Sequence, residues 1–418
     1  MSAASSAHLV ERLQPVRQGI IVFRTEGIGR RKNPFLEELM MEMSKDIRPI
    51  LDRALAGERL TADDCAALLA SDDFLSIGVA ADQMRMRLHP DGIVTYIIDR
   101  NINYTNVCNV VCTFCAFYRR PGAKDAYVLS LDEVCRKIDE TIAAGGTGIL
   151  MQGGLHPDFG IEWYEELLRE LHGRYPQLQL HCFSPPEIHN IHLISKLSYE
   201  EVLARLKGAG LYSLPGGGAE ILDDEVRRRI STKCTTAQWL DVMRAAHRVG
   251  LRSTATMMFG IGDRLEHRVR HLQRIRDLQD ETGGFTAFIP WTFQRENTAL
   301  GRRIKEEPTG VDYLKMLAVS RLFLDNIENI QVSWLTQGLR LGQVALRFGA
   351  NDMGSVMIEE NVISAAGAHF RADEATLRRL IENAGFTPQQ RDILYRHVHR
   401  RPGEPALQNE MPATTVAG

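Results

Sequence analysis

Hydrophobic positions recur along this chain in two different patterns. From about residue 35 to residue 86 they keep the three-to-four-residue spacing of amphipathic helices. From residue 92 onward, short apolar runs rich in β-branched residues alternate with longer segments of helical spacing. This alternation predicts parallel strands connected by helices, as in α/β proteins.

The alternating part contains about eight strand–helix units. The predicted strands cover residues 93–98, 147–151, 178–183, 211–214, 253–259, 287–289, 330–333 and 353–357. Helical spacing predicts helices between them at 131–144, 162–171, 199–209, 237–249, 264–279 and 312–326. Eight strand–helix units favour a closed (β/α)₈ barrel of the TIM type over an open doubly wound sheet.

These patterns predict four segments. They are an N-terminal extension at 1–34, a helical segment at 35–90 packed on the barrel, the barrel at 91–400 and a flexible tail at 401–418. Residues that carry chemistry follow the predicted strands, in loops such as 108–115, 153–154, 184–187 and 215–220. Because barrel active sites are built from the loops after the strands, this placement predicts an enzyme.

Composition narrows the class of protein. The net charge of −3 lacks the basic excess of nucleic-acid-binding proteins. No apolar run reaches the roughly 18 residues that span a bilayer, and the N-terminus lacks the apolar core of a secretory signal. We therefore expect a cytoplasmic protein with a small-molecule substrate, no nucleic-acid partner and no membrane partner. The sequence does not specify its oligomeric state.

Three of the seven cysteines form a cluster with the spacing Cys-x₃-Cys-x₂-Cys, at Cys108, Cys112 and Cys115. Three thiolates can bind three irons of a 4Fe–4S cluster and leave the fourth iron open for a non-protein ligand. A zinc site or a closed electron-transfer cluster would need a fourth ligand, and no second pair follows nearby. The remaining cysteines fit small buried apolar residues; they are Cys65, Cys135, Cys182 and Cys234.

The cysteine loop, with the aromatic residue Phe114 before its third cysteine, resembles the radical S-adenosylmethionine (SAM) superfamily. The resemblance implies a single 4Fe–4S cluster on these cysteines, whose open iron is chelated by the methionine part of SAM. An electron from the reduced cluster then releases a 5′-deoxyadenosyl radical from the cofactor. A small electron donor such as a flavodoxin or a ferredoxin is the implied protein partner.

The same resemblance suggests further cofactor contacts. Gly153 and Gly154 match the family's glycine pair at the methionine amino group, although glycines in this position also suit a plain turn. Glu220 stands where relatives contact the ribose hydroxyls, and Lys233 where they usually place an arginine for the methionine carboxylate. Three further residues complete the set of expected cofactor contacts. They are Phe114 in the cysteine loop, Ser184 directly after the predicted strand 178–183, and Met258 in the predicted strand 253–259.

Longer stretches resemble one branch of the superfamily, the radical enzymes of the menaquinone futalosine pathway and of deazaflavin synthesis. These stretches are 101–108, 115–117, 153–157 and 181–187, and the match runs over about residues 35–397. Segments 216–220, 289–294, 332–335 and 350–355 are most similar to the cyclases of this branch. An aminofutalosine synthase, a deazaflavin synthase subunit and a non-enzymatic iron–sulfur or zinc protein are the alternatives.

Resemblance to the cyclases implies that the substrate is dehypoxanthine futalosine. The radical would take hydrogen from the sugar C4′, and the new radical would add to the benzoate ring. The candidate substrate contacts are polar and aromatic residues after the later strands, Trp291, Gln294, Asn297, Trp334 and Asn351. Candidates for the base that removes the final proton are Asp352, His156 and Tyr104.

Overall fold

The computed structural model describes residues 46–399. The predictions for the extension at 1–34, for residues 35–45 and for the tail at 401–418 lie outside these residues. The described part opens with three helices, α2 (Arg48–Ala56), α3 (Ala62–Ala70) and α4 (Phe74–Leu88). Helix α3 begins at a capping box, in which Thr61 and Asp64 satisfy each other's backbone N–H groups.

The strands that follow are short and pair only in parallel within two sheets. The larger sheet has the order β2-β3-β4-β5-β6-β7-β8 and the smaller one the order β10-β1-β9. The bounds are β1 (Ile93–Ile97), β2 (Asn101–Ile102), β3 (Gly148–Met151), β4 (Gln179–Cys182), β5 (Ser213–Leu214), β6 (Arg252–Phe259), β7 (Phe285–Thr292), β8 (Asn329–Ile330), β9 (Asp352–Ser355) and β10 (Thr387–Gln390).

The two sheets join into one barrel at two places. On one side, β1 leads within three residues into β2, which pairs with β3. On the other side, Gln331 after β8 forms a parallel bridge with Asp352 of β9, and β9 pairs with β1. The barrel therefore has eight strand positions. The first is formed by β1 and its continuation β2, and the other seven are β3 to β9 in order. Strand β10 lies outside this series, beside β1.

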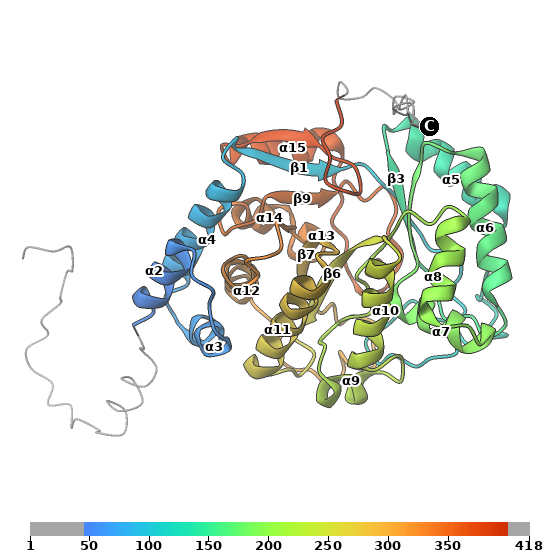
Figure 1. Ribbon diagram of the computed structural model, residues 1–418, viewed down its shortest axis with the longest axis horizontal. Coiled ribbons are helices and arrows are strands. Elements are labelled where there is room, and N and C mark those ends of the chain that lie inside the picture. Colours follow the sequence, from blue (N-terminus) through green and yellow to red (C-terminus); the bar gives the residue numbers. More distant parts are fainter. Residues whose placement is uncertain (1–45, 400–418) are drawn as a thin grey trace, which may run out of the picture. The chain divides into compact units, whose positions relative to one another are not determined.

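The helices cover the outside of this barrel (Figure 1). Helices α3 and α4 pack on α11 and α12, so the N-terminal helices add a further layer on one side. The bounds are α5 (Leu131–Ala143), α6 (Ile161–Arg174), α7 (Pro185–Ser195), α8 (Tyr199–Gly208), α9 (Asp224–Ile230), α10 (Thr236–Arg248), α11 (Leu265–Thr282), α12 (Gly310–Phe323), α13 (Trp334–Gln337), α14 (Leu339–Ala345), α15 (Glu374–Asn383) and the 3₁₀ turn η1 (Ser364–Ala366).

The predicted α/β class and TIM-like barrel are confirmed. Each of the eight predicted strand runs contains or overlaps one observed strand, from β1 to β9 without β2. The structure adds β10, whose sequence Thr-Pro-Gln-Gln lacks the apolar run of the other strands. Proline cannot donate a hydrogen bond within a sheet, and β10 accordingly pairs with β1 alone.

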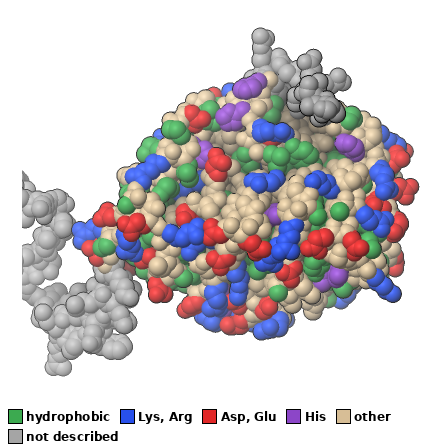
Figure 2. All heavy atoms as spheres, viewed as in Figure 1, with side chains coloured by type: hydrophobic (Ala, Val, Ile, Leu, Met, Phe, Trp, Pro, Cys, Tyr) green, Lys and Arg blue, Asp and Glu red, His purple; other side chains and the backbone are tan. Residues whose placement is uncertain are grey.

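One face of the molecule is polar and mixed in charge (Figure 2). Acidic and basic side chains are interspersed over the face in Figure 2, with hydrophobic ones scattered among them. Among the described residues, no helix is both long enough and apolar enough to cross a bilayer.

Candidate active site

The cysteine loop follows β2 and is held from both sides by backbone hydrogen bonds. The N–H of Cys108 donates to the carbonyl of Arg119, 2.9 Å away, and Thr113 donates to the carbonyl of Ile230 at the end of α9. The thiol of Cys112 lies 3.0 Å from Oγ of Ser231. The loop is therefore anchored by the same segment that carries Lys233.

The three thiols are not gathered as closely as the ligands of a single zinc ion. Tetrahedral zinc with Zn–S bonds of about 2.3 Å places its sulfurs about 3.8 Å apart. Within residues 46–399, Asp223, Glu225 and His267 form the only set of three or more His, Cys, Asp or Glu residues whose ligand atoms all lie within 4.8 Å of one another. At least one pair among the thiols of Cys108, Cys112 and Cys115 therefore lies more than 4.8 Å apart, which is wider than the sulfur spacing around one shared zinc ion.

The glycine pair after β3 lets this loop approach the barrel. A Cβ on Gly154 would lie 2.1 Å from the carbonyl oxygen of Val107, and one on Gly153 would lie 2.6 Å from the ring of Tyr104. The N–H of Gly154 donates to the carbonyl of Thr105 at 2.9 Å. Only glycine therefore fits at residue 154, where the backbone of the cysteine loop touches the loop after β3.

Glu220 and Lys233 form a buried ion pair beside the cysteine loop. Nζ of Lys233 lies 2.5 Å from Oε2 of Glu220 and 4.9 Å from the centre of the Phe114 ring. The same Oε2 accepts no aligned hydrogen bond, and the backbone of Glu220 has a left-handed φ of 38°. Glu220 thus brings a charge-paired carboxylate on a strained backbone to the edge of the cysteine loop.

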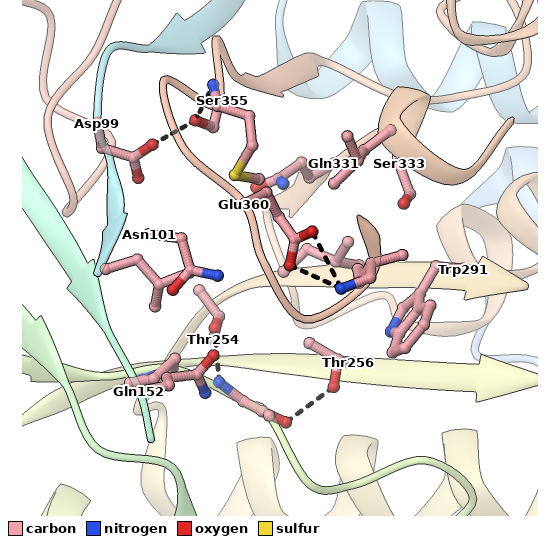
Figure 3. Close-up of a pocket in the computed structure, with 18 of the residues that line it drawn as sticks. Asp99, Asn101, Gln152, Thr254, Thr256, Trp291, Gln331, Ser333, Ser355 and Glu360 are labelled. Carbon is pink, nitrogen blue, oxygen red and sulfur yellow. Dashed lines mark hydrogen bonds between the residues drawn. The ribbon is translucent and has the colours of Figure 1, made fainter. Parts of the chain in front are cut away.

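A cavity of about 350 Å³ opens at the carboxyl ends of the strands. Phe114 and Glu220 line one side of it, so the cavity begins at the cysteine loop. Figure 3 shows polar side chains converging on it from β6, β7, β9 and the connection after β1. The polar and aromatic residues of the lining are Asp99, Asn101, Phe114, Gln152, His181, Glu220, Thr254, Thr256, Trp291, Gln331, Ser333, Trp334, Ser355, Glu360, Arg391 and Tyr395.

Asp99 brings a carboxylate to this cavity from the end of β1. Its side chain and Ser355 of β9 point toward each other in Figure 3, and the Ser355 hydroxyl donates a short hydrogen bond to Oδ1. Asp99 is 7% exposed, and this burial raises the pKa of its carboxyl to about 6. The group can therefore change its charge near neutral pH.

The far side of the cavity holds a buried cation that is already paired. Arg391, after β10, contacts both carboxylate oxygens of Asp352, at 2.5 and 3.0 Å. Burial and the charge of Arg391 lower the pKa of His181 to about 3, so this imidazole is neutral. Its Nδ1 lies 2.7 Å from Oγ of Ser213. The cavity thus offers neutral hydrogen-bonding groups rather than an unpaired cation.

Comparison with known proteins identifies the family. Residues 102–275 match the model of the radical SAM superfamily, and residues 282–402 match the CofH/MqnC C-terminal region. The chain is 51% identical over 347 residues to a cyclic dehypoxanthine futalosine synthase of Halalkalibacterium halodurans, covering 83% of this chain and 93% of that protein. The chain belongs to the radical SAM superfamily. Membership implies a 4Fe–4S cluster and SAM as cofactors.

Other relatives match over similar lengths. A cyclic dehypoxanthine futalosine synthase of Streptomyces coelicolor is 45% identical, covering 86% of this chain and 90% of that protein. A 5-amino-6-(D-ribitylamino)uracil–L-tyrosine 4-hydroxyphenyl transferase of Methanococcoides burtonii is 41% identical, covering 84% and 98%. The crystal structure of methylornithine synthase shares the fold, with a TM-score of 0.64 at 19% identity, covering 81% of this chain and 96% of that chain.

Most of the residues expected to bind cofactor lie in the cysteine loop or beside it. Phe114 and Glu220 line the cavity, Lys233 pairs with Glu220, and Gly154 contacts the cysteine loop. Ser184 caps α7 and its hydroxyl donates to Glu187. The backbone N–H of Met258 donates to the carbonyl of Glu220, while the side chain packs in the core. Phe114, Gly154 and Lys233 thus adjoin the cysteine loop, whereas the side chains of Ser184 and Met258 have partners elsewhere.

The residues expected to bind substrate divide into two groups. Trp291 and Trp334 line the cavity. The others lie outside its lining: Gln294 donates to the carbonyl of Thr292, and Asn297 donates to the carbonyl of Ala365. Asn351 precedes β9 and accepts a hydrogen bond from Arg321, at 2.7 Å. Local sequence similarity placed these three near the site, but their side chains bind the protein's own backbone and core.

The three candidate bases also lie outside the cavity lining, and each has a structural partner. Asp352 is fully buried against Arg391, and the hydroxyl of Tyr104 donates to the carboxylate of Glu187. His156 stacks on the ring of Phe159. We therefore do not propose any of the three as the base.

Several residues of the lining were not among the sequence candidates. Thr254 and Thr256 alternate with buried apolar residues along β6, so the two-residue period of this strand could have identified them. Asp99 follows the apolar run of β1 directly, which is the position where barrel enzymes place catalytic groups. Arg391 follows β10, a strand without a sequence signal.

Proposed function

We propose that this radical SAM enzyme converts dehypoxanthine futalosine to its cyclic form in menaquinone biosynthesis. The observation that carries the proposal is the 51% and 45% identity, over more than four fifths of the chain, to two cyclic dehypoxanthine futalosine synthases. The lining of the cavity supports it, since a mostly neutral polar and aromatic wall suits a sugar joined to an aromatic ring.

In this proposal a single 4Fe–4S cluster is held by Cys108, Cys112 and Cys115, with the fourth iron left to SAM. When bound, these cofactors supply a 5′-deoxyadenosyl radical that abstracts hydrogen. Lys233 offers a cation to the carboxylate of SAM, and the carboxylate of Glu220, paired with Lys233, accepts a hydrogen bond from a ribose hydroxyl. Phe114 lines the cavity next to Lys233.

The remaining lining would hold the substrate. Trp291 and Trp334 offer aromatic surface to the benzoate ring. The hydroxyl of Thr256 donates to the carbonyl of Gly216, and that of Thr254 accepts from the N–H of the same residue. The two threonines thus fix the glycine-rich loop after β5 against the cavity.

The test is an anaerobic assay with reconstituted cluster, a reductant, SAM and dehypoxanthine futalosine. Substrate-dependent 5′-deoxyadenosine and a product two hydrogens lighter than the substrate are the expected results. With substrate deuterated at C4′, the label should appear in 5′-deoxyadenosine. Turnover of the substrate of an aminofutalosine synthase or of the 4-hydroxyphenyl transferase, but not of dehypoxanthine futalosine, would reassign the enzyme within the branch.

A flavodoxin or a ferredoxin is the electron donor in this proposal. Exposed arginines flank the cysteine loop: Arg120 donates to the carbonyl of Asn109 within it, and Arg228 lies on α9 next to the segment that binds Cys112. An acidic redox protein would be attracted to such a rim. Changing Arg228 to Glu should lower turnover supported by flavodoxin, and lower it further at low salt relative to the wild type, while turnover with dithionite stays unchanged.

A further inference from the structure

The proposed reaction requires a proton acceptor in the cavity. Addition of a sugar radical to an aromatic ring forms one carbon–carbon bond and leaves a radical delocalised over the ring. To recover aromaticity, a ring that still carries hydrogen at the attacked carbon loses that hydrogen as a proton and also loses one electron. The electron needs a one-electron acceptor of the iron–sulfur class, and the proton needs a base within reach of the ring.

We propose that Asp99 is this base, accepting the ring proton on Oδ2 while Ser355 holds Oδ1. The inference rests on the function proposed above and adds to it the group that completes the reaction. In the step, the carbon–hydrogen bond of the ring breaks, the proton passes to Oδ2, and the electron leaves to the acceptor. Asp99 returns its proton to solvent after the product has left.

The geometry of Asp99 fits this role. Its carboxylate lines the cavity, and the Ser355 hydroxyl donates to one oxygen only. Among residues 46–399, no other group donates a hydrogen bond to this carboxylate, so Oδ2 faces the cavity without a protein partner (Figure 3). The carbonyl of Asp99 accepts from the N–H of Ile358, which fixes the backbone.

The other carboxylates of the lining are already engaged. Both oxygens of Glu360 accept backbone N–H groups, from Val362, Ile363 and Ser364. Glu220 is paired with Lys233 at the cofactor end of the cavity. Neither can take up a proton without losing these contacts.

The neutral groups of the lining are poor acceptors. His181 is held neutral by burial and by Arg391, and a pKa of about 3 leaves it little affinity for a proton. Burial raises the pKa of the Tyr395 phenol, so this group keeps its proton. Asp99 is the group in the lining with both a free oxygen and a suitable basicity.

The charges around Asp99 set that basicity. Burial raises its pKa most, and the hydroxyl of Ser355 and the charge of Arg391 lower it, while the charge of Asp352 raises it. Because Asp352 neutralises much of Arg391, burial prevails and the pKa reaches about 6. A base with a pKa near the working pH is both ionised and able to hold the transferred proton.

The first experiment compares Asp99→Asn with wild type under the anaerobic assay described above. Asparagine keeps the shape and can still accept from Ser355, but it cannot take a proton. We expect deuterium transfer from C4′ into 5′-deoxyadenosine to stay within about threefold, and the ratio of cyclised product to 5′-deoxyadenosine to fall by about 100-fold. The exposed Asp139→Asn variant is the control and should keep both values.

Three outcomes are distinguishable. If wild type makes no substrate-dependent 5′-deoxyadenosine, both the proposed function and the role of Asp99 are wrong. If wild type cyclises the substrate and Asp99→Asn keeps the wild-type product ratio, the function stands and Asp99 is not the base. Loss of deuterium transfer in Asp99→Asn with a full cluster would place Asp99 in an earlier step and also overturn the inference.

A second variant tests the base through its pH dependence. Ser355→Ala removes a donor that lowers the pKa of Asp99, so the acidic limb of the product ratio should move to higher pH. The groups that also face Asp99, Arg391 and Asp352, are untouched. An acidic limb that stays at its wild-type pH would contradict the role of Asp99, provided that the cluster content of the variant is normal.

Discussion

Nζ of Lys233 lies 2.5 Å from Oε2 of Glu220, and together they link the cysteine loop to the cavity. The sequence suggested separate roles for them, one at the carboxylate of SAM and one at its ribose. Their pairing brings two side chains of opposite charge into contact in a buried place. The cofactor therefore enters a site in which cation and anion are already compensated.

This pairing predicts the behaviour of Lys233 variants. Lys233→Met leaves Glu220 with only Arg227, whose Nη1 is 3.8 Å away, so SAM should bind about 10- to 100-fold more weakly. Lys233→Arg keeps a cation beside Phe114 and should bind within a few-fold of wild type. Anaerobic calorimetry with SAM measures both, and an unchanged affinity in Lys233→Met would contradict the assignment.

The cluster ligands make a second prediction. Cys112→Ala should abolish cluster binding, because the remaining two cysteines cannot hold three irons, and iron and sulfide per chain should fall close to zero after reconstitution. Cys135→Ala is the matched control, since Cys135 is a buried core residue of α5 and its loss should leave iron content normal. Equal iron in the two variants would exclude Cys112 as a ligand.

The third prediction concerns the glycine after β3. Gly154→Ala drives a Cβ to 2.1 Å from the backbone carbonyl of Val107, which cannot move aside as a side chain would. We expect a loss of about 1–3 kcal/mol in stability and a displaced cysteine loop that binds less iron.

The matched control for this glycine is Gly173, in α6, where an added Cβ meets no atom within 4 Å. Gly173→Ala should leave the iron content unchanged and stabilise the helix by up to about 1 kcal/mol. Thermal denaturation and iron analysis of the two variants separate the effects. A Gly154→Ala protein with full stability and full iron content would show that the close approach is not needed.

Much of the barrel could be predicted because its signals are local. The two-residue period and apolar runs of strands such as β3, β4 and β6 appear in the sequence itself, as do the cysteine spacing and the glycine pair. Strand β10 was not predicted, because its polar, proline-containing sequence forms a strand only through its pairing with β1. Its order comes from tertiary pairing, which a single sequence does not display.

The cavity was predicted less well for a related reason. Asp352 looks like a candidate base until Arg391 is placed beside it, and these residues are far apart in the chain and meet only through β9, β1 and β10. Similarly, Asp99 differs from other carboxylates only through its burial and its contact with Ser355. Residue type and spacing can predict where the active-site loops lie. Which carboxylate has an oxygen without a protein partner depends on burial and on contacts between distant segments.

The buried histidines predict how stability depends on pH. Burial, with nearby arginines, lowers the pKa of His271 to about 3, and burial with Arg252 lowers that of His247 to about 4. In the unfolded chain a histidine titrates near 6.5, so below this pH the unfolded state binds protons that the folded state does not. Stability is therefore complete above about pH 6.5 and is lost as the pH falls toward 4.

At pH 5.5 each of these histidines should cost about 1.4 kcal/mol relative to neutral pH. Urea unfolding at pH 7.5 and 5.5 measures the difference, and His247→Gln should reduce it by about that amount because glutamine does not titrate. The exposed His369→Gln serves as control and should retain the full wild-type difference. If His247→Gln retains it as well, His247 is not held neutral in the folded protein, and its contacts with Thr282 and Ser253 must accommodate a charged ring.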